Sequence, residues 1–328
     1  MSGPTLPRPL LLGAVLAALA PTAAAQSTVP DDIRDRLIEI GFASPYAASD
    51  SIYLPLLARA PKDGVGVTKD LEYGPHARHR LDTYRPDGAS AAPILVYVHG
   101  GGYRTGERDI NAEIYGNVLY YFARHGLVGV NATYRLAPEA AWPSGAEDMR
   151  DIIRWVKAHA RELGGDPDRI FMMGHSAGAT HVATYAFDPR FQPEQGHGLA
   201  GIVLVSGRYV IKDDPDDPSL DGIRMYFGSD PVAYPSRSSV THVPGSDIPA
   251  LLAIAEYDQR NLVETTGELF VALCDRDDGR CPRLIQLPYH NHMTELAHFN
   301  TGDDLFGREI LAFVHEGADR QRANARAR

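Results

Sequence analysis

The sequence has little cysteine, little tryptophan and no excess of positive charge. Its 328 residues include two cysteines and two tryptophans, and 42 acidic residues outnumber 32 Lys and Arg to give a formal charge of -10. Phosphate backbones and anionic lipids repel such a chain, so we expect no nucleic-acid partner. A content of 44% hydrophobic and 23% charged residues is typical of a globular protein with a large core.

The sequence also lacks the long apolar runs of a membrane protein. Leu10 to Ala20 is apolar but reaches only about half of the roughly 20 residues that a spanning helix needs. Arg8 precedes this stretch and three alanines, Ala23 to Ala25, follow it, which is the pattern of a secretory signal peptide. We therefore expect cleavage of residues 1–25, no stable membrane anchor, and a secreted or periplasmic protein.

The two cysteines, Cys274 and Cys281, lie seven positions apart in a polar stretch. An exported chain meets an oxidising compartment, so the pair predicts a local disulfide. Zinc binding is disfavoured because no further Cys or His lies nearby. The acidic run at 212–218 lacks calcium-loop spacing and is interpreted as a solvated loop. We expect no metal ion.

Short apolar segments alternate with helical patterns from residue 67 onward, which predicts an α/β fold with a mostly parallel sheet covered by helices on both faces. Apolar residues recur at helical spacing over 147–163. The length suits one domain, taken as 26–318. The eight predicted strands are 67–73, 79–84, 94–98, 127–134, 170–173, 201–205, 251–255 and 284–287.

Three segments are expected to lie outside this core. Residues 31–60 are helix-like, and residues 208–249 form a long connection with several prolines. Because such a connection exceeds what a tight crossover needs, we expect both segments to contribute to a small lid. The Arg- and Ala-rich end, 319–328, is predicted to be a flexible tail.

A Gly-x-Ser-x-Gly pattern, Gly174-His175-Ser176-Ala177-Gly178, directly follows a predicted strand and precedes a helix-compatible run. A sharp turn between strand and helix would present the Ser176 hydroxyl for attack, and the flanking glycines would avoid collisions there. The helix N-terminus would favour the negative charge that develops during acyl transfer. Ser176 is the predicted nucleophile.

A second glycine-rich turn, His99-Gly100-Gly101-Gly102, ends the strand at 94–98. Consecutive glycines let backbone N–H groups point into a shared cavity, as an oxyanion hole requires. The predicted donors are Gly101 and Gly102, with Gly100 as a further one, and the N–H of Ala177. A phosphate-binding loop is disfavoured because the turn has no Gly-Lys-Ser/Thr ending.

A serine nucleophile needs a base and an acid, which follow it in the order acid, then histidine, in this fold. Asp258 comes just after an apolar strand and is the predicted acid, with Glu256 as the alternative. The predicted base is His292, which follows the last strand, with His290 and His298 as competitors.

Taken together, the glycine turn, the run Tyr134-Arg135-Leu136-Ala137-Pro138-Glu139 and the Ser176 motif resemble the hormone-sensitive-lipase-like carboxylesterases and the related kynurenine-formamidase and feruloyl-esterase branch of the α/β hydrolases. The resemblance runs from about residue 81 to about residue 314. It implies an acid after the seventh strand and a histidine after the eighth, where Asp258 and His292 fall. His175 and Ala179 depart from the usual Asp and Gly, toward the formamidase-like and feruloyl-esterase-like branch.

We therefore expect a secreted serine carboxylesterase that hydrolyses small to medium esters through an acyl-enzyme, without a cofactor. One alternative is an arylformamidase or amide hydrolase that uses the same three residues. The other is a non-catalytic binding protein on a hydrolase scaffold, because a fold alone does not establish activity. The sequence does not predict an oligomeric state.

Overall fold

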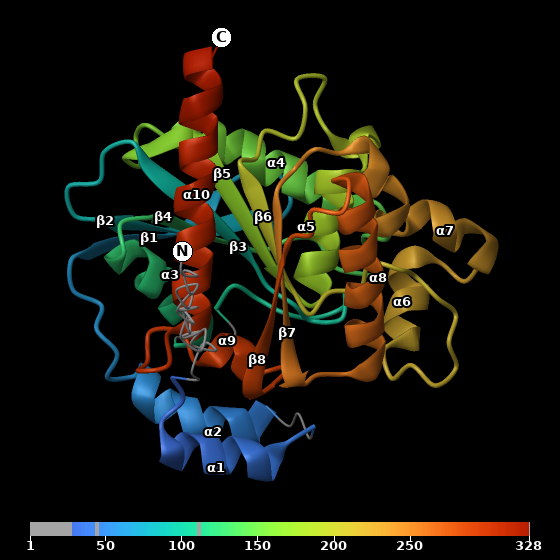
Figure 1. The fold of residues 1–328 in the computed structure, drawn as a ribbon, viewed down its shortest axis with the longest axis horizontal. Helices are drawn as coiled ribbons and strands as arrows, with labels where there is room; N and C mark the ends of the chain where they lie inside the picture. Colours follow the sequence, from blue (N-terminus) through green and yellow to red (C-terminus); the bar gives the residue numbers. More distant parts are fainter. Residues whose placement is uncertain (1–27, 43–45, 110–112, 328) are drawn as a thin grey trace, which may run out of the picture.

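The computed structural model describes residues 28–42, 46–109 and 113–327, with the backbone alone for residues 46–47 and 318–327. The expected signal segment, 1–25, lies outside the described residues. A single eight-stranded sheet runs through the molecule in the order β1-β2-β4-β3-β5-β6-β7-β8 (Figure 1). The strands are β1 (Val65–Glu72), β2 (Arg80–Pro86), β3 (Ala92–Val98), β4 (Val128–Ala132), β5 (Gly165–His175), β6 (Gly201–Val205), β7 (Ala250–Tyr257) and β8 (Arg283–Asn291).

The sheet is mostly parallel, as the sequence predicts. β2 pairs antiparallel with both β1 and β4, whereas every neighbouring pair from β4 across to β8 is parallel. All seven residues of β3 and all five of β6 are buried, because helices cover both faces of these central strands. The carboxyl ends of β3, β5, β6, β7 and β8 therefore meet at one edge.

Helices form a layer on each face of the sheet. On one face, α4, α5 and α8 pack against the sheet through one apolar cluster. On the other face, α3 and α10 pack through a second cluster, which also includes α1, α2 and α9. The helices are α1 (Asp31–Ile40), α2 (Tyr46–Leu57), α3 (Ile114–Arg124), α4 (Ser144–His159), α5 (Ala177–Phe187), α6 (Leu220–Phe227), α7 (Tyr234–Arg237), α8 (Arg260–Arg276), α9 (Thr294–Ala297) and α10 (Leu305–Ala327).

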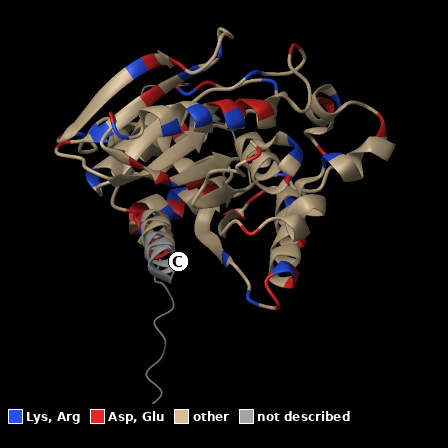
Figure 2. Cartoon of the chain, turned by 90° about the horizontal axis from the view of Figure 1, so that it is seen from above, with Lys and Arg blue, Asp and Glu red and all other residues tan. Residues whose placement is uncertain are grey.

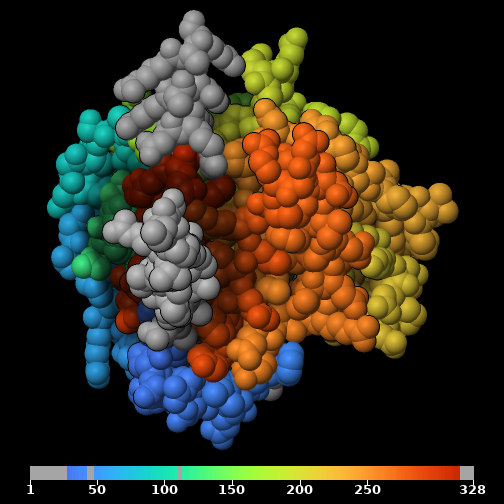
Figure 3. Space-filling model, in the orientation of Figure 1, coloured from blue at the N-terminus to red at the C-terminus, as the bar shows by residue number. Residues whose placement is uncertain are grey.

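The first two helices lie at one end of the molecule, beside elements from the end of the chain. α1 contacts β8, and α2 contacts α9. In the space-filling view the blue α1 and α2 lie against the orange and red C-terminal part (Figure 3). Acidic and basic residues are interspersed along the helices and loops of Figure 2.

Several boundaries differ from the sequence-based expectations. β5 begins at Gly165, where Gly165 is paired with Ala92, rather than at residue 170. The backbone of residues 319–327 continues α10, in keeping with the strong helix propensity of Arg and Ala. The predicted disulfide between Cys274 and Cys281 is present. Within the described ranges, no helix is long and apolar enough to cross a membrane.

Candidate active site

Ser176 occupies a sharp turn between β5 and α5. Its backbone has φ 55° and ψ -123°, a left-handed conformation that is costly for a residue with a side chain. The flanking glycines permit this turn: a Cβ at Gly174 would lie 2.6 Å from the backbone of Ala179, and one at Gly178 would lie 2.4 Å from the carbonyl oxygen of Val98. The predicted strand–turn–helix context of Ser176 is therefore present.

Three residues from the ends of three strands meet at this turn. Nε2 of His292 lies 3.0 Å from Oγ of Ser176, and Nδ1 of His292 lies 3.0 Å from Oδ1 of Asp258. Asp258 and His292 are buried, at 3% and 8% exposure. Since one imidazole bridges a hydroxyl and a carboxylate, it can accept the hydroxyl proton while the carboxylate holds its other N–H.

The alternative residues lie elsewhere. The carboxylate of Glu256 is exposed and accepts a hydrogen bond from the backbone N–H of Tyr289 at 2.6 Å. His290 is paired with Asp303 at 2.9 Å, and Nδ1 of His298 donates to the carbonyl oxygen of Thr294 at 3.1 Å. Of the three histidines, the structure brings only His292 within hydrogen-bond distance of Ser176 in the described part of the chain.

The carboxylate of Asp258 is stabilised in its charged form. Burial alone would raise its pKa, but the hydrogen bond and charge of His292, the Ser206 hydroxyl and the N–H of Gln259 outweigh this effect and lower the pKa. The N–H of Gln259 donates to Oδ1 of Asp258 at 2.8 Å. A charged Asp258 stabilises the imidazolium that forms on His292 when it takes a proton.

The glycine turn after β3 faces Ser176. A Cβ at Gly100 would lie 2.9 Å from Cβ of Ser176, and one at Gly101 would lie 2.0 Å from the carbonyl oxygen of Thr105. Gly101 and Gly102 have φ of 127° and 57°, which favour glycine. The four predicted oxyanion donors, Gly100, Gly101, Gly102 and Ala177, all line the same cavity as Ser176 and His292.

That cavity has a volume of about 180 Å³. Two lining residues, Arg208 and Ser219, come from the 208–249 connection, whereas none comes from 31–60. Arg208 is buried and forms an ion pair with Asp217 at 2.8 Å. A larger hollow of about 570 Å³ lies beside α1, α2 and residues 300–304 but contains none of Ser176, His292 or Asp258. We take the smaller cavity as the candidate active site because Ser176 and His292 lie in its wall.

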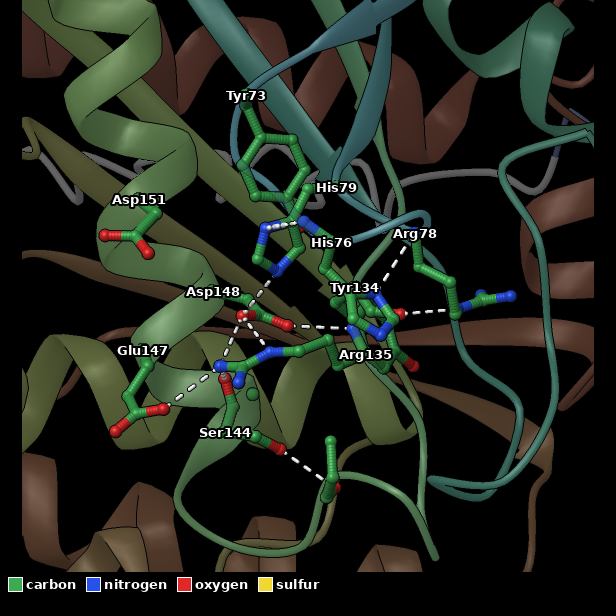
Figure 4. Close-up of polar contacts among 12 residues, drawn as sticks. Tyr73, His76, Arg78, His79, Tyr134, Arg135, Ser144, Glu147, Asp148 and Asp151 are labelled. Carbon is green, nitrogen blue, oxygen red and sulfur yellow. Dashed lines mark hydrogen bonds and ion pairs between the residues drawn. The ribbon is translucent and has the colours of Figure 1, made fainter.

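Figure 4 shows a second polar network, centred on Asp148, whose labelled residues are not among those that line the cavity. The buried carboxylate of Asp148 accepts from Nε of Arg135 at 2.7 Å and lies 3.1 Å from Nε2 of His79. This fixes the segment that begins at Tyr134, whose hydroxyl donates to the carbonyl oxygen of His99 at 3.0 Å. The network is thus connected to the turn that carries Gly100.

Sequence reasoning missed one cluster beneath Ser176. Nε2 of His175 lies 3.0 Å from Oε1 of Glu295, and the Ser206 hydroxyl lies 2.8 Å from Oε2 of the same carboxyl group. Glu295 is fully buried, at 0% exposure. The only sequence signal was the adjacency of His175 to the nucleophile and of Glu295 to His292.

Among the described residues, two groups of side chains are close enough to hold a metal ion. One contains His175, His292 and Glu295, and the other contains His290, His298 and Asp303. The described contacts give these side chains protein partners without an ion: His292 bonds Ser176 and Asp258, and His290 bonds Asp303 directly. We assign no metal ion to either group.

Comparisons with known proteins agree with this geometry. The BD-FAE family model matches residues 81–188. The chain is 37% identical to the probable carboxylic ester hydrolase LipM of Mycobacterium tuberculosis over 76% of this chain and 63% of that protein, and 36% identical to the esterase LipQ of the same organism over 76% and 62%. The chain thus spans less than two thirds of the length of these relatives.

A solved structure of esterase B from Lactobacillus rhamnosis superposes with a TM-score of 0.69 and 17% identity, covering 90% of this chain and 99% of that one. Fold and comparisons together define an α/β hydrolase. The chain has the α/β-hydrolase fold, and its sequence is similar to those of carboxylic ester hydrolases.

Proposed function

We propose that the chain is a carboxylic ester hydrolase in which Ser176 is the nucleophile, His292 the general base and Asp258 the acid that orients it. The observation that carries this proposal is the bridging imidazole, 3.0 Å from the Ser176 hydroxyl on one side and 3.0 Å from the Asp258 carboxylate on the other. The names of the esterase relatives LipM and LipQ support the same reaction class.

In this mechanism His292 removes the proton of Ser176 while the hydroxyl oxygen attacks the ester carbonyl. The oxyanion that forms is held by the N–H groups of Gly101, Gly102 and Ala177, which line the cavity together with Gly100. His292 then protonates the leaving alcohol, and water repeats the sequence on the acyl-enzyme. Apart from the ester and water, these steps use side chains and backbone groups of the chain.

The cavity favours small esters. A volume of about 180 Å³ is below the roughly 300 Å³ at which drug-sized pockets begin. The apolar side chains in its wall include Leu262 and Met293, while Arg208, Ser219 and Gln259 contribute polar groups. We propose short acyl chains as the preferred substrates.

Hydrolysis of p-nitrophenyl acetate, butyrate and octanoate tests this function, with N-formylkynurenine as the formamide comparison. The expected result is turnover that declines from acetate to octanoate and is lost in Ser176→Ala. Ser236→Ala is the matched control, because Ser236 is exposed and lies outside the residues that line the cavity. Turnover of the formamide alone would assign the chain to the formamidase type, and no turnover of any substrate would reject hydrolase activity.

We also propose export of the chain, based on the pattern of residues 1–25. The disulfide between Cys274 and Cys281 supports this, because disulfides persist in oxidising compartments. Expression of the full chain in a bacterium, followed by N-terminal sequencing of the periplasmic fraction, should give a protein that begins at Gln26. Recovery of the uncleaved chain in the cytoplasm would contradict export.

A further inference from the structure

A second carboxyl group lies beside the imidazole of His292. Oε1 of Glu295 is 3.6 Å from Nδ1 of His292, and Oδ1 of Asp258 is 3.0 Å from the same nitrogen. Both carboxyl groups are buried, and no Lys or Arg in the described part of the chain forms an ion pair with Glu295. The mechanism proposed above uses Asp258 and leaves Glu295 without a role.

Two buried carboxyl groups at one imidazole do not ionise independently. Like charges this close raise the free energy of the doubly charged state, so one group keeps its proton. Asp258 is the nearer of the two to Nδ1 of His292, at 3.0 Å against 3.6 Å for Glu295, and it also accepts from the N–H of Gln259. Burial and the neighbouring charge of Asp258 raise the pKa of Glu295 well above its ordinary value. The proton therefore belongs on Glu295.

Glu295 also connects three strand ends that must stay aligned. Its Oε1 faces Nε2 of His175, the residue before the nucleophile, at 3.0 Å, and its Oε2 lies 2.8 Å from the Ser206 hydroxyl after β6. Nε2 of His175 also lies 3.0 Å from the carbonyl oxygen of His292. Since both neighbours of Nε2 are acceptors, His175 carries its proton on Nε2, and burial lowers its pKa to about 3, so the ring is neutral.

We propose that Glu295 is a positioning residue that holds His175 and His292 in register as an uncharged carboxylic acid, so that Asp258 is the only charged partner of the catalytic imidazole. In this arrangement Oε1 accepts from His175, while the proton on Oε2 is donated to Ser206. The hydrogen of Ser206 is then free to interact with the carboxylate of Asp258, whose charged form Ser206 stabilises. The inference rests on the proposed function of Ser176, His292 and Asp258.

The other titratable groups that interact with Glu295 do not supply a charge. Tyr97 and Tyr209 are fully buried, and burial raises the pKa of both phenols. Of the described groups around Glu295, Asp258 stays charged in the proposed mechanism, and the imidazole of His292 is the group that gains and loses a proton. The pH dependence of ester hydrolysis therefore reports directly on whether Glu295 carries a charge.

The test compares Glu295→Gln and Glu295→Leu with the wild-type chain in pH profiles of kcat and kcat/KM on p-nitrophenyl acetate. Gln keeps the shape and can still accept from His175 and donate to Ser206, so we expect kcat within about threefold and an unshifted acidic limb. Leu removes these hydrogen bonds and should lower kcat by on the order of 100-fold through misalignment of His292. Glu264→Gln is the control for loss of a surface carboxylate, since Glu264 is paired with Arg260 on α8.

Two results would overturn the proposal. If Glu295→Gln moves the acidic limb down by about one pH unit or more, Glu295 carries a negative charge that stabilises the imidazolium. If Glu295→Leu retains wild-type kcat, Glu295 positions nothing.

Infrared difference spectra of wild type against Glu295→Gln give a readout that does not require activity. A band from a protonated carboxylic acid, present in the wild type and absent from the variant, is expected. Its absence from both would reject the uncharged state, even if the wild type hydrolyses no ester and the proposed function itself fails.

Discussion

His290 and His292 stand two residues apart, and each is paired with an aspartate at nearly the same distance. Nδ1 of His292 lies 3.0 Å from Asp258, and Nε2 of His290 lies 2.9 Å from Asp303. The rings differ at the other nitrogen. Nε2 of His292 lies within hydrogen-bond distance of the Ser176 hydroxyl at the wall of a cavity. Nδ1 of His290 instead lies 3.2 Å from the hydroxyl of Thr294 in the protein interior.

A buried histidine–aspartate pair is therefore not sufficient to identify a catalytic site. A third such pair, His79 and Asp148, braces the turn that begins at Tyr134 (Figure 4). What separates the His292 pair from the others is a serine hydroxyl in a strained turn that opens on a cavity. We therefore propose that the histidine–aspartate bond serves catalysis at His292 and stability at His290 and His79.

Substitution of His292 and of His290 by alanine should give the largest difference between the catalytic and the structural histidine. We expect His292→Ala to lower kcat by on the order of 10⁴-fold or more, because the general base is lost. His290→Ala should keep kcat within about tenfold but lower the free energy of unfolding by about 3 kcal/mol, because Asp303 would be left buried without its partner. Ester hydrolysis and urea unfolding of both variants provide the measurement. Equal losses of kcat in the two variants would contradict the distinction.

The two aspartates should behave in the same contrasting way. Asp258→Asn should lower kcat by on the order of 10³- to 10⁴-fold with little change in KM, because the imidazolium loses its charged partner. Asp303→Asn should leave kcat nearly unchanged and lower the free energy of unfolding by about 2 kcal/mol.

The stability contribution of Asp303 should depend on pH. Burial opposes ionisation of Asp303, but His298 and His290 outweigh the effect of burial and lower the pKa of Asp303. The stability difference between wild type and Asp303→Asn should therefore be full above about pH 5 and shrink as the pH falls; a difference that grows toward low pH would refute this.

Buried neutral histidines should make the fold sensitive to mild acid. Burial lowers the pKa of His99 and His298 to about 4, and of His175 and His181 to about 3. Because the unfolded chain protonates these groups below about pH 6.5, each costs stability as the pH falls, by about 2 kcal/mol between pH 7 and pH 5. His181→Gln, at a site that the mechanism does not use, should flatten the urea-unfolding pH profile by about 1 to 2 kcal/mol. An unchanged slope would show that His181 is not kept neutral.

The smallest effect on catalysis should come from the disulfide. It joins the last turn of α8 to the loop that follows and, like His290, lies outside the wall of the Ser176 cavity. Cys274→Ser with Cys281→Ser should lower the free energy of unfolding by about 2 kcal/mol and leave kcat unchanged. Thermal unfolding and p-nitrophenyl acetate turnover of the double variant test this. A large loss of kcat would contradict this prediction, because it would mean that the disulfide affects the geometry of the Ser176 cavity.

Local patterns were sufficient to predict the sheet and the position of Ser176. Strands such as β3 and β6 are short apolar runs because both faces are covered, and the Gly174 to Gly178 motif is a local turn whose glycines are required by close backbone contacts. The choice of His292 over His290 was harder to derive. In an extended strand both side chains would point to one face, and the outcome depends on β8 ending at Asn291.

The Glu295 cluster could not be derived from local patterns. His175, Ser206 and Glu295 come from the ends of β5 and β6 and from α9, and they meet only when the sheet aligns these ends. The backbone of Ser206 has φ 49°, a conformation that no local motif predicts for serine.

The most direct test of the roles of Ser176 and His292 is the rate at which a p-nitrophenyl phosphonate labels the chain, followed by peptide mass mapping. We expect one label on Ser176 in the wild type and in His290→Ala at similar rates, and labelling slower by on the order of 10³-fold in His292→Ala, because the base no longer activates the hydroxyl. A label on another residue, or His292→Ala labelled as fast as the wild type, would contradict the assignment.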